Sequence, residues 1–339
     1  MADLSKWDGV GVASLAKWDN VGVSDGTLAK WNGVTIPAGA AATKAYIAGG
    51  LISGTRQSAT DVATLASESM AAGAGALSAA RGNFFDGVLS DSTYGYHVGG
   101  LEASIVNTVD KHAYADDTRS AATNNLGTAT WGGATLNASS TKGWAIGGRT
   151  GGGATAAANR FTMPAETWAV VAGAAATVAR YRGAGVFGTS DHGYFGGGNS
   201  IGSSGTTLDK ISHAAETTAA VAGGLATARS LMCAFSDGGT ASYMHGRTNA
   251  GTDIDTLGKI VPSTDTTSDT GSILATARYF ASGFSQSSAT AWITGGVGGG
   301  SDLASSEKFA FATETFSTLA GMALSAAKSS ASETCDAGF

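Results

Sequence analysis

Basic residues that recur at one place of a long repeat are the first candidates for chemistry in this 339-residue sequence. Each closes the pattern Leu/Ala-x-x-Ala-basic, and the set is Arg81, Arg180, Arg229, Arg278 and Lys328. If they form a ring on one face, guanidinium and ammonium groups predict an anionic ligand, for example an acidic sugar. The alternative is an ion pair or carbonyl contact repeated in every unit. Repetition favours that alternative, because a binding site usually breaks symmetry, and the breaks here are Thr130 and Arg247. Arg247 is therefore included in the candidate ligand face.

Acidic residues also recur. One set precedes Thr or Ser, and its members are Glu68, Asp117, Glu166, Glu216, Asp265 and Glu314. Seven residues before each lies a second position, which in three repeats is an acid followed by Lys: Asp110-Lys111, Asp209-Lys210 and Glu307-Lys308. We interpret the acids of the first set as turn residues that also bond between repeats, because carboxylates satisfy backbone donors at tight turns.

Catalytic and metal-binding patterns are missing from the sequence. The five histidines, His97, His112, His192, His213 and His245, have no metal-ligand spacing such as two His four residues apart. There is no Cys-x-x-Cys, no Walker loop and no Gly-x-Ser-x-Gly elbow. We therefore expect no catalytic residue, no metal and no cofactor.

The elements that must position these residues follow a repeat of about fifty residues. An aromatic residue, two linking residues and two glycines recur, led by Tyr46, Tyr96, Trp144, Tyr194, Tyr243 and Trp292 at intervals of 48 to 50 residues. The copy at Gly246-Arg247 is degraded. Each repeat holds four stretches of strand length without helical periodicity, which predicts a propeller blade.

The double glycine after an aromatic-bearing strand, with a basic residue opening the innermost strand, resembles the kelch family and the central domain of galactose oxidase-like proteins. The resemblance covers roughly residues 43–339 and implies an all-β, six-bladed propeller. The usual outer-strand tryptophan stands here only at Trp168, so we expect thinner blades. One branch of the fold carries a copper-radical site of Tyr, Cys and His ligands, and we can assemble no such set here.

The last repeat predicts how the ring closes. It begins at Val297 and ends at Phe339 without its own aromatic-Gly-Gly strand. We expect residues 44–50 to supply that strand. The closing blade would take its innermost strand from 328–337 and its other three from about 44–76. This closure would remove exposed strand edges that could otherwise template aggregation.

Residues 1–42 follow a shorter repeat and predict an extended N-terminal arm, separate from a propeller at 43–339. Three beads place Asp-Gly, Asp-Asn or Asn-Gly between a Trp and a Val, which predicts small strand–turn–strand units. Such beads resemble tandem repeats near the N-termini of tailed-bacteriophage structural proteins. Exposed tryptophans are common interface anchors, so we expect docking on another protein or copy rather than on the chain's own propeller. The docking residues would be Lys6, Trp7, Lys17, Trp18, Lys30 and Trp31.

The composition limits the partners. Charged residues are 14% and the net charge is −6, so phosphate neutralisation and nucleic-acid binding are not expected. The sequence has no run of about 18 apolar residues, so we predict no membrane span. The N-terminus lacks the apolar core of a signal peptide, so we expect synthesis in a cytoplasm. Cys233 and Cys335 are too few for a disulfide framework, and we predict free thiols.

The sequence thus favours a non-enzymatic virion protein of a tailed phage, assembled in the host cytoplasm and located in the particle as a capsid, neck or tail decoration or a fibre. Residues 1–36 would bind other virion proteins, the propeller would project outward, and the protein would be a homo-oligomer in the particle. The alternative is a lectin-like propeller that binds a host surface glycan or receptor. An oxidase or glycan-active enzyme on the kelch fold is less favoured.

Overall fold

The computed structural model describes residues 43–73, 75–199, 205–248, 251–271 and 273–335, and the backbone of four short strands before them. The chain divides into two compact units, Met1–Ala41 and Ala42–Phe339. The larger unit contains every described side chain and is described first.

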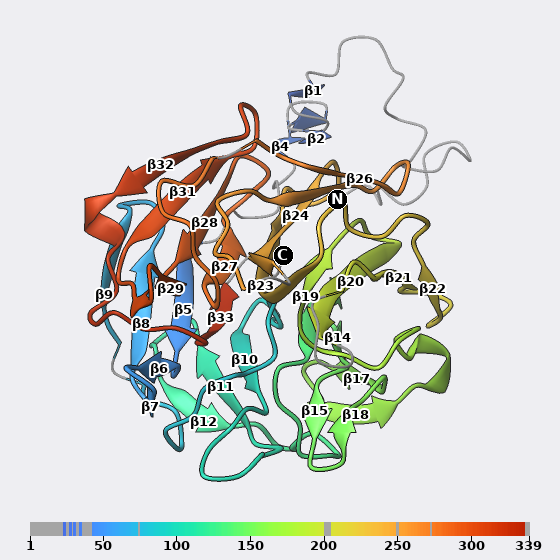
Figure 1. Cartoon of the computed structure of the whole chain (residues 1–339), viewed down its shortest axis with the longest axis horizontal. Coiled ribbons are helices and arrows are strands. Elements are labelled where there is room, and N and C mark those ends of the chain that lie inside the picture. Colours follow the sequence, from blue (N-terminus) through green and yellow to red (C-terminus); the bar gives the residue numbers. More distant parts are fainter. Residues whose placement is uncertain are drawn as a thin grey trace. The chain divides into compact units, whose positions relative to one another are not determined.

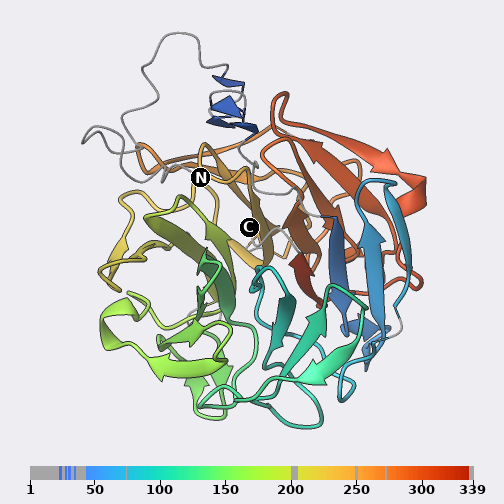
Figure 2. The same cartoon turned by 180° about the vertical axis from the view of Figure 1, so that it is seen from behind.

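Residues Ala42–Phe339 form an all-β propeller of six blades, which Figures 1 and 2 show as a ring of sheets. Blade 1 is β33 (Ser332–Cys335), β5 (Lys44–Ala48), β8 (Thr60–Thr64) and β9 (Ser69–Ala72). Blade 2 is β10 (Tyr94–Val98), β11 (Val109–Ala113) and β12 (Arg119–Ala121). Blade 3 is β13 (Ala134–Ser139), β14 (Lys142–Ile146), β17 (Ala158–Thr162) and β18 (Thr167–Val170).

The remaining three blades follow the same antiparallel order. Blade 4 is β19 (Tyr181–Phe187), β20 (His192–Asn199), β21 (Leu208–Ser212) and β22 (Thr218–Ala220). Blade 5 is β23 (Arg229–Ser236), β24 (Ser242–Thr248), β25 (Gly258–Val261) and β26 (Thr266–Asp269). Blade 6 is β27 (Ser282–Ser285), β28 (Thr290–Thr294), β31 (Ser306–Ala310) and β32 (Thr315–Leu319).

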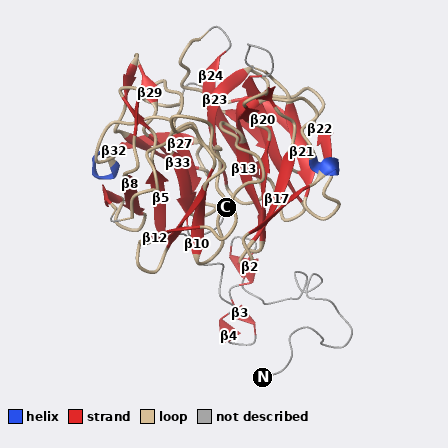
Figure 3. Cartoon of the chain, turned by 90° about the horizontal axis from the view of Figure 1, so that it is seen from below, coloured by secondary structure: helices blue, strands red, loops and turns tan. Residues whose placement is uncertain are grey.

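Short elements decorate the blades. Three two-stranded hairpins lie between the second and third long strands of their blades: β6 (Leu51–Ile52) with β7 (Thr55–Arg56), β15 (Arg149–Thr150) with β16 (Gly153–Ala154), and β29 (Val297–Gly298) with β30 (Ser301–Asp302). Two 3₁₀ turns, η2 (Ala172–Ala174) and η3 (Ala320–Met322), lie at the outside of the sheets (Figure 3).

The ring closes as the sequence predicts. The C-terminal β33 pairs with the N-terminal β5, with Ser332 opposite Ala48 and Thr334 opposite Tyr46. Strands β8 and β9 complete this blade within the predicted range 44–76. Blade 1 therefore joins both ends of the propeller and leaves no free inner edge between blades 6 and 2.

Blade 2 departs from the expected four strands. Its innermost segment, 82–90, forms no regular strand and touches β10 through the isolated bridge Ser90–Gly95. The reason is that its backbone forms hydrogen bonds with other blades. Asp86 N–H donates to the Gly133 carbonyl, and the Asp86 carbonyl accepts from Thr135 N–H and Gly185 N–H. Innermost segments of blades 2, 3 and 4 are thereby joined at the centre.

The double glycine links blades 1, 2, 3 and 6 to the blade that follows each of them. In blade 1, Gly49 and Gly50 have φ of +66° and +94°, which side chains rarely adopt. Gly50 N–H donates to the carbonyl of Arg81 at 2.9 Å. A Cβ on Gly49 would lie 2.7 Å from that same carbonyl oxygen. The glycines are therefore required by the backbone contact between neighbouring blades and not by a ligand.

Apolar side chains fill the spaces between blades. Six buried clusters are found among the described residues, one for each interface between neighbouring blades. The six leading aromatics of the repeat are 0 to 2% exposed. Each fully buried aromatic stabilises the fold by about 1.5–3 kcal/mol. The outer strands are largely exposed, as in β9 and β26.

The smaller unit, Met1–Ala41, is described only as backbone strands. Strand β1 (Val23–Ser24) pairs with β2 (Thr27–Leu28), and β3 (Lys30–Trp31) pairs with β4 (Val34–Thr35). The second hairpin coincides with the third tryptophan bead. The first two beads lie outside the described residues.

Candidate functional site

The recurring basic residues are buried in ion pairs. Arg81, Arg229 and Arg278 are 0% exposed, and Arg180 and Lys328 are 4% and 3% exposed. Each meets a carboxylate of its own blade: Arg81–Asp110 at 2.7 Å, Arg180–Asp209 at 2.8 Å, Arg229–Asp269 at 2.7 Å, Arg278–Glu307 at 2.6 Å and Lys328–Asp61 at 2.6 Å. Burial lowers the pKa of all five, and the carboxylates oppose that shift. Of the two interpretations, the geometry supports the repeated structural ion pair, since these groups do not face solvent.

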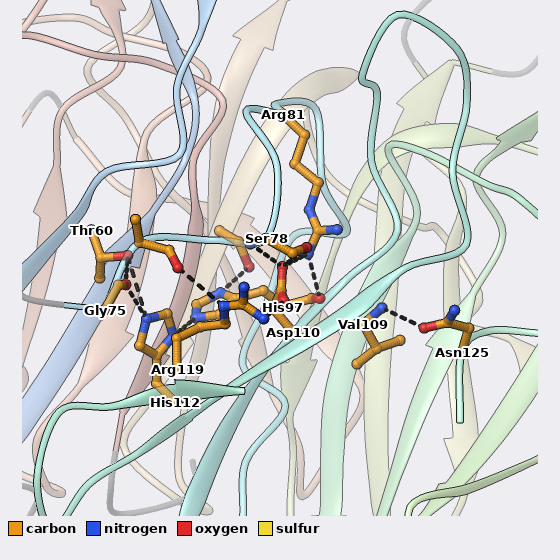
Figure 4. A network of polar contacts seen from close by, with 12 residues as sticks. Thr60, Gly75, Ser78, Arg81, His97, Val109, Asp110, His112, Arg119 and Asn125 are labelled. Atoms are coloured by element: carbon orange, nitrogen blue, oxygen red, sulfur yellow. Dashed lines mark hydrogen bonds and ion pairs between the residues drawn. The ribbon is translucent and has the colours of Figure 1, made fainter. Parts of the chain in front are cut away.

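Figure 4 shows this arrangement in blade 2. The Asp110 carboxylate accepts from Arg81 at 2.7 Å and from the Ser78 hydroxyl at 2.9 Å, and Arg119 lies 3.1 Å away. Arg81 also donates to the His97 carbonyl at 3.4 Å. The carboxylate thus fixes the start of the innermost segment against β11.

Two histidines that the sequence shows as scattered meet beside this network (Figure 4). His97 Nε2 and His112 Nδ1 are 3.0 Å apart, and His97 Nδ1 lies 2.9 Å from the Ser332 hydroxyl of blade 1. His112 Nε2 lies 2.6 Å from the Gly75 carbonyl. Burial lowers the pKa of both rings, so both are neutral near neutral pH. This pair is a buried link between blades 1 and 2.

A second set of ion pairs joins each blade to the next. The pairs are Lys44–Asp117, Lys111–Glu166, Arg160–Glu216, Lys210–Asp265, Lys259–Glu314 and Lys308–Glu68. Each acid occupies the turn before an outermost strand, at φ between 48° and 59°. Adjacent residues of a strand point to opposite faces. In β11, therefore, Asp110 forms an ion pair within its own blade, while Lys111 forms one with the next blade.

Tyrosines and one exchanged lysine complete the inter-blade set. The Tyr194 hydroxyl donates to Asp265 at 2.5 Å and the Tyr243 hydroxyl to Glu314 at 2.9 Å. In blade 1 the basic position holds Val62, and Lys44 of the adjacent β5 supplies the charge instead. The repeated acids are thus turn residues that also bond between blades, as the sequence indicates.

A ring of residues with left-handed backbone surrounds the centre on one face. Its members, at intervals of 49 or 50 residues, are Asn83, Gly132, Arg182, Leu231, Phe280 and Ser330, with φ between 52° and 61°. Their backbones bond from blade to blade; for example, Gly132 N–H donates to Asn83 at 3.0 Å, and Ser330 N–H donates to Phe280 at 2.9 Å. Sequence reasoning missed this ring because the position has a constant spacing but no constant residue type.

Aromatic and arginine side chains gather at this ring over blades 3 and 4. We call Trp131, Arg149, Tyr181 and Arg182 the arginine–aromatic cluster. The Trp131 and Tyr181 rings are 5.1 Å apart, and the Arg182 guanidinium lies 5.2 and 5.3 Å from their centroids. Arg149 lies 5.9 and 5.5 Å from the same two rings. A narrow pocket of about 10 Å³ opens beside it, lined in part by Trp131, Arg182 and Phe280.

Arg247, the remaining predicted ligand-face residue, is on β24 and partly exposed. Its guanidinium lies 4.5 Å from the centroid of Tyr279, whose neighbour Phe280 also contacts Arg182 at 5.8 Å. Arg247 Nε donates to the Gly251 carbonyl at 2.5 Å and lies 3.3 Å from Asp253. The structure therefore separates Arg247 from the five buried basic residues and places it near the arginine–aromatic cluster.

The other predicted features have these positions. Both cysteines are free and buried, and burial raises the pKa of the Cys233 thiol. Lys6, Trp7, Lys17 and Trp18 lie outside the described residues, and Lys30 and Trp31 are described as backbone alone. Within the described residues, no three His, Cys, Asp or Glu side chains are grouped as metal ligands, and no helix is long and apolar enough to cross a bilayer.

The fold and these contacts define a six-bladed β-propeller whose blades are held by two repeated sets of ion pairs. No protein-family model matches the chain, and no curated protein is significantly similar to it.

Proposed function

We propose that this protein is a non-enzymatic structural component of a tailed-phage particle, with residues 1–36 bound to other particle proteins and a kelch-like propeller displayed outward. The observation that carries the proposal is the repeated Lys-Trp bead in a unit separate from the propeller. Three indoles in short beads supply large apolar anchors for a partner or a second copy. The capsid, the neck and the tail are all candidate docking places.

The charges of the propeller fit a display role. Fourteen ion pairs, within and between blades, use most of its charged side chains for its own stability. The closing pairing of β33 with β5 covers the inner edge of β5, which guards against association through that edge where many copies are crowded together.

The test is complementation of a phage that lacks this gene. Full-length protein or a variant lacking residues 1–36 is supplied in trans, and purified particles are assayed by immunoblot with an antibody to the propeller. We expect the full-length protein to sediment with particles. The truncated protein should stay in the soluble fraction with an unchanged thermal transition. Equal incorporation of the two proteins would disprove the anchoring role.

A recognition role for the propeller is the second candidate. It is favoured by one observation, the arginine–aromatic cluster at the centre of one face, which the six-fold repeat does not account for.

A further inference from the structure

The pairing of basic side chains sets two arginines apart. The described part of the propeller contains seventeen Lys and Arg residues, and fourteen of them form an ion pair with a described carboxylate. The exceptions within this part are Arg56, Arg149 and Arg182. Two of these three lie together in the arginine–aromatic cluster.

The cluster is built by the backbone as well as by the rings. Trp131 and Arg149 exchange two backbone hydrogen bonds, of 3.1 and 2.8 Å, which hold the β15–β16 hairpin beside the indole. Arg182 is fixed by its own N–H, which donates to Gly132 at 2.5 Å. The backbones of both arginines are therefore fixed before any ligand arrives, and their guanidinium groups lie over the rings of Trp131 and Tyr181. A site already in place lowers the entropic cost of binding.

Two like charges beside each other need an anion. The Arg182 guanidinium is half-buried; burial lowers its pKa, and the charge of Arg149 lowers it further. Residues 118–190 contain six basic residues and a single acid, Glu166, in a chain of net charge −6. Glu166 is already paired with Lys111. Asp86 also lines the pocket beside Arg182, but the two form no ion pair, and burial raises the pKa of the Asp86 carboxyl. A guanidinium whose face lies over an aromatic ring keeps its N–H edge for a planar acceptor.

We propose that Arg149 and Arg182 bind the carboxylate of an acidic glycan at the centre of this face. This inference deepens the recognition role and does not depend on attachment to a particle. Tyr181 and Phe280 are partly exposed and offer apolar surface to the sugar. The adjacent hairpin residues Thr150 to Gly153 offer backbone and hydroxyl groups.

A glycan fits better than the other anionic partners. A stable protein interface has a core of buried apolar side chains. Among the described residues the exposed large hydrophobics are Val170 and Val178, on blade 3 and its link to blade 4 and outside the cluster. Nucleic acid is disfavoured by the overall negative charge, since two arginines neutralise few phosphates.

The site breaks the symmetry of the repeat. The positions equivalent to Arg182 hold Asn83, Gly132, Leu231, Phe280 and Ser330. The residue after the double glycine is Arg149 in blade 3, whereas it is Leu51, Leu101 and Val297 in three other blades. The two arginines are therefore not part of the structural pattern that all blades share.

The experiment uses the full chain on an array of uronic-acid and sialic-acid glycans, followed by calorimetry with the tightest one. The matched probe is the same glycan with its carboxylate methyl-esterified. We expect binding of the free acid and loss of binding on esterification. Arg149→Gln and Arg182→Gln should each weaken binding by at least about tenfold, because a hydrogen bond to a charged group is lost.

Arg56→Gln is the matched control, because it removes an unpaired arginine from the equivalent hairpin, β6–β7, of another blade. It should leave affinity unchanged. Arg182 has a left-handed backbone, so Arg182→Gln could prevent folding. In that case the Arg149→Gln variant, at an exposed position, provides the test. Binding to no acidic glycan on the array, or equal weakening by Arg56→Gln, would overturn the proposal. So would arginine-dependent capture of a polyglutamate peptide without glycan binding.

Discussion

Gly258 and Asp269 lie opposite each other across β25 and β26. The Asp269 carboxylate pairs with the buried basic residue of this blade, whereas in other blades that partner is an acid at the position of Gly258. In those blades an acid on the third strand pairs with the basic residue before the innermost strand. Here Asp269, one strand further out, reaches Arg229 at 2.7 Å. In blade 3 the ion pair is absent from these positions, because Thr130 stands at the basic position and Asn159 at the acidic one.

Removal of this carboxylate should destabilise the propeller strongly. We expect Asp269→Ala to lower the free energy of unfolding by about 3 kcal/mol, because Arg229 is fully buried and would keep an uncompensated charge. Urea denaturation measures the loss. The double variant Gly258→Asp/Asp269→Ala should recover most of it. The nearest atom to a Cβ at Gly258 is Arg229 Nε at 3.5 Å, so a carboxylate there has both space and partner. No recovery would contradict the exchange of positions.

The two sets of ion pairs should differ in strength. Asp110→Ala leaves Arg81 buried without a partner, because both side chains are 0% exposed, and should cost about 3–5 kcal/mol. Lys308→Ala should cost less than about 1 kcal/mol, because Lys308 and Glu68 are 30% and 34% exposed and water screens the pair. Denaturant titrations at two salt concentrations compare them. Similar costs for the two variants would contradict the difference in burial.

A buried carboxyl pair at the centre should make stability depend on pH. Glu333 Oε1 accepts from Gly87 N–H at 3.0 Å, beside Asp86. Burial raises the pKa of Glu333 to about 8 and that of Asp86 above its usual range. A carboxyl whose pKa is higher in the folded chain than in the unfolded chain stays protonated in the folded chain at pH values between the two, where the unfolded chain has lost the proton. Its stabilising contribution is complete below pH ~4.3 and is lost as pH rises toward 8.

Glu333→Gln should therefore flatten the pH profile. Wild-type stability should fall between pH 5 and pH 8 by up to about 1.4 kcal/mol per pH unit relative to the variant. Thermal unfolding at a series of pH values measures this difference. The half-exposed Glu102→Gln serves as control and should keep the wild-type slope. An unchanged slope in Glu333→Gln would show that this carboxyl does not titrate in that interval.

The seam of blade 1 should be essential for the closed ring. Truncation after Lys328 removes β33 and exposes the inner edge of β5, which paired with it from Ala45 to Ala48. We expect loss of cooperative unfolding and self-association through the open edge, as size-exclusion chromatography would show. Truncation after Cys335 keeps every residue of β33 and is the control. A monomeric, cooperatively folded product without β33 would refute the requirement for closure.

Much of the fold could be predicted because the repeat records it locally. The aromatic-Gly-Gly strand and the acid before Thr or Ser recur at a nearly constant interval, and the chain end after Lys328 lacks a partner strand. These features are sufficient for six blades and a closing pairing. Blade 2 could not be predicted in detail, because Asp86 has its backbone hydrogen bonds with blades 3 and 4, and such long-range competition has no local signal.

The candidate site is the part that tertiary structure decided. The sequence by itself determined the period, the glycines and the recurring charges, because each repeats in register with one blade. It did not determine which charges are satisfied. Arg81 and its equivalents are buried and paired with carboxylates of their own blades. Arg149 and Arg182, 33 residues apart and in neighbouring blades, remained without a described carboxylate on one pair of rings. That distinction depends on distances between blades, which no spacing along the chain contains.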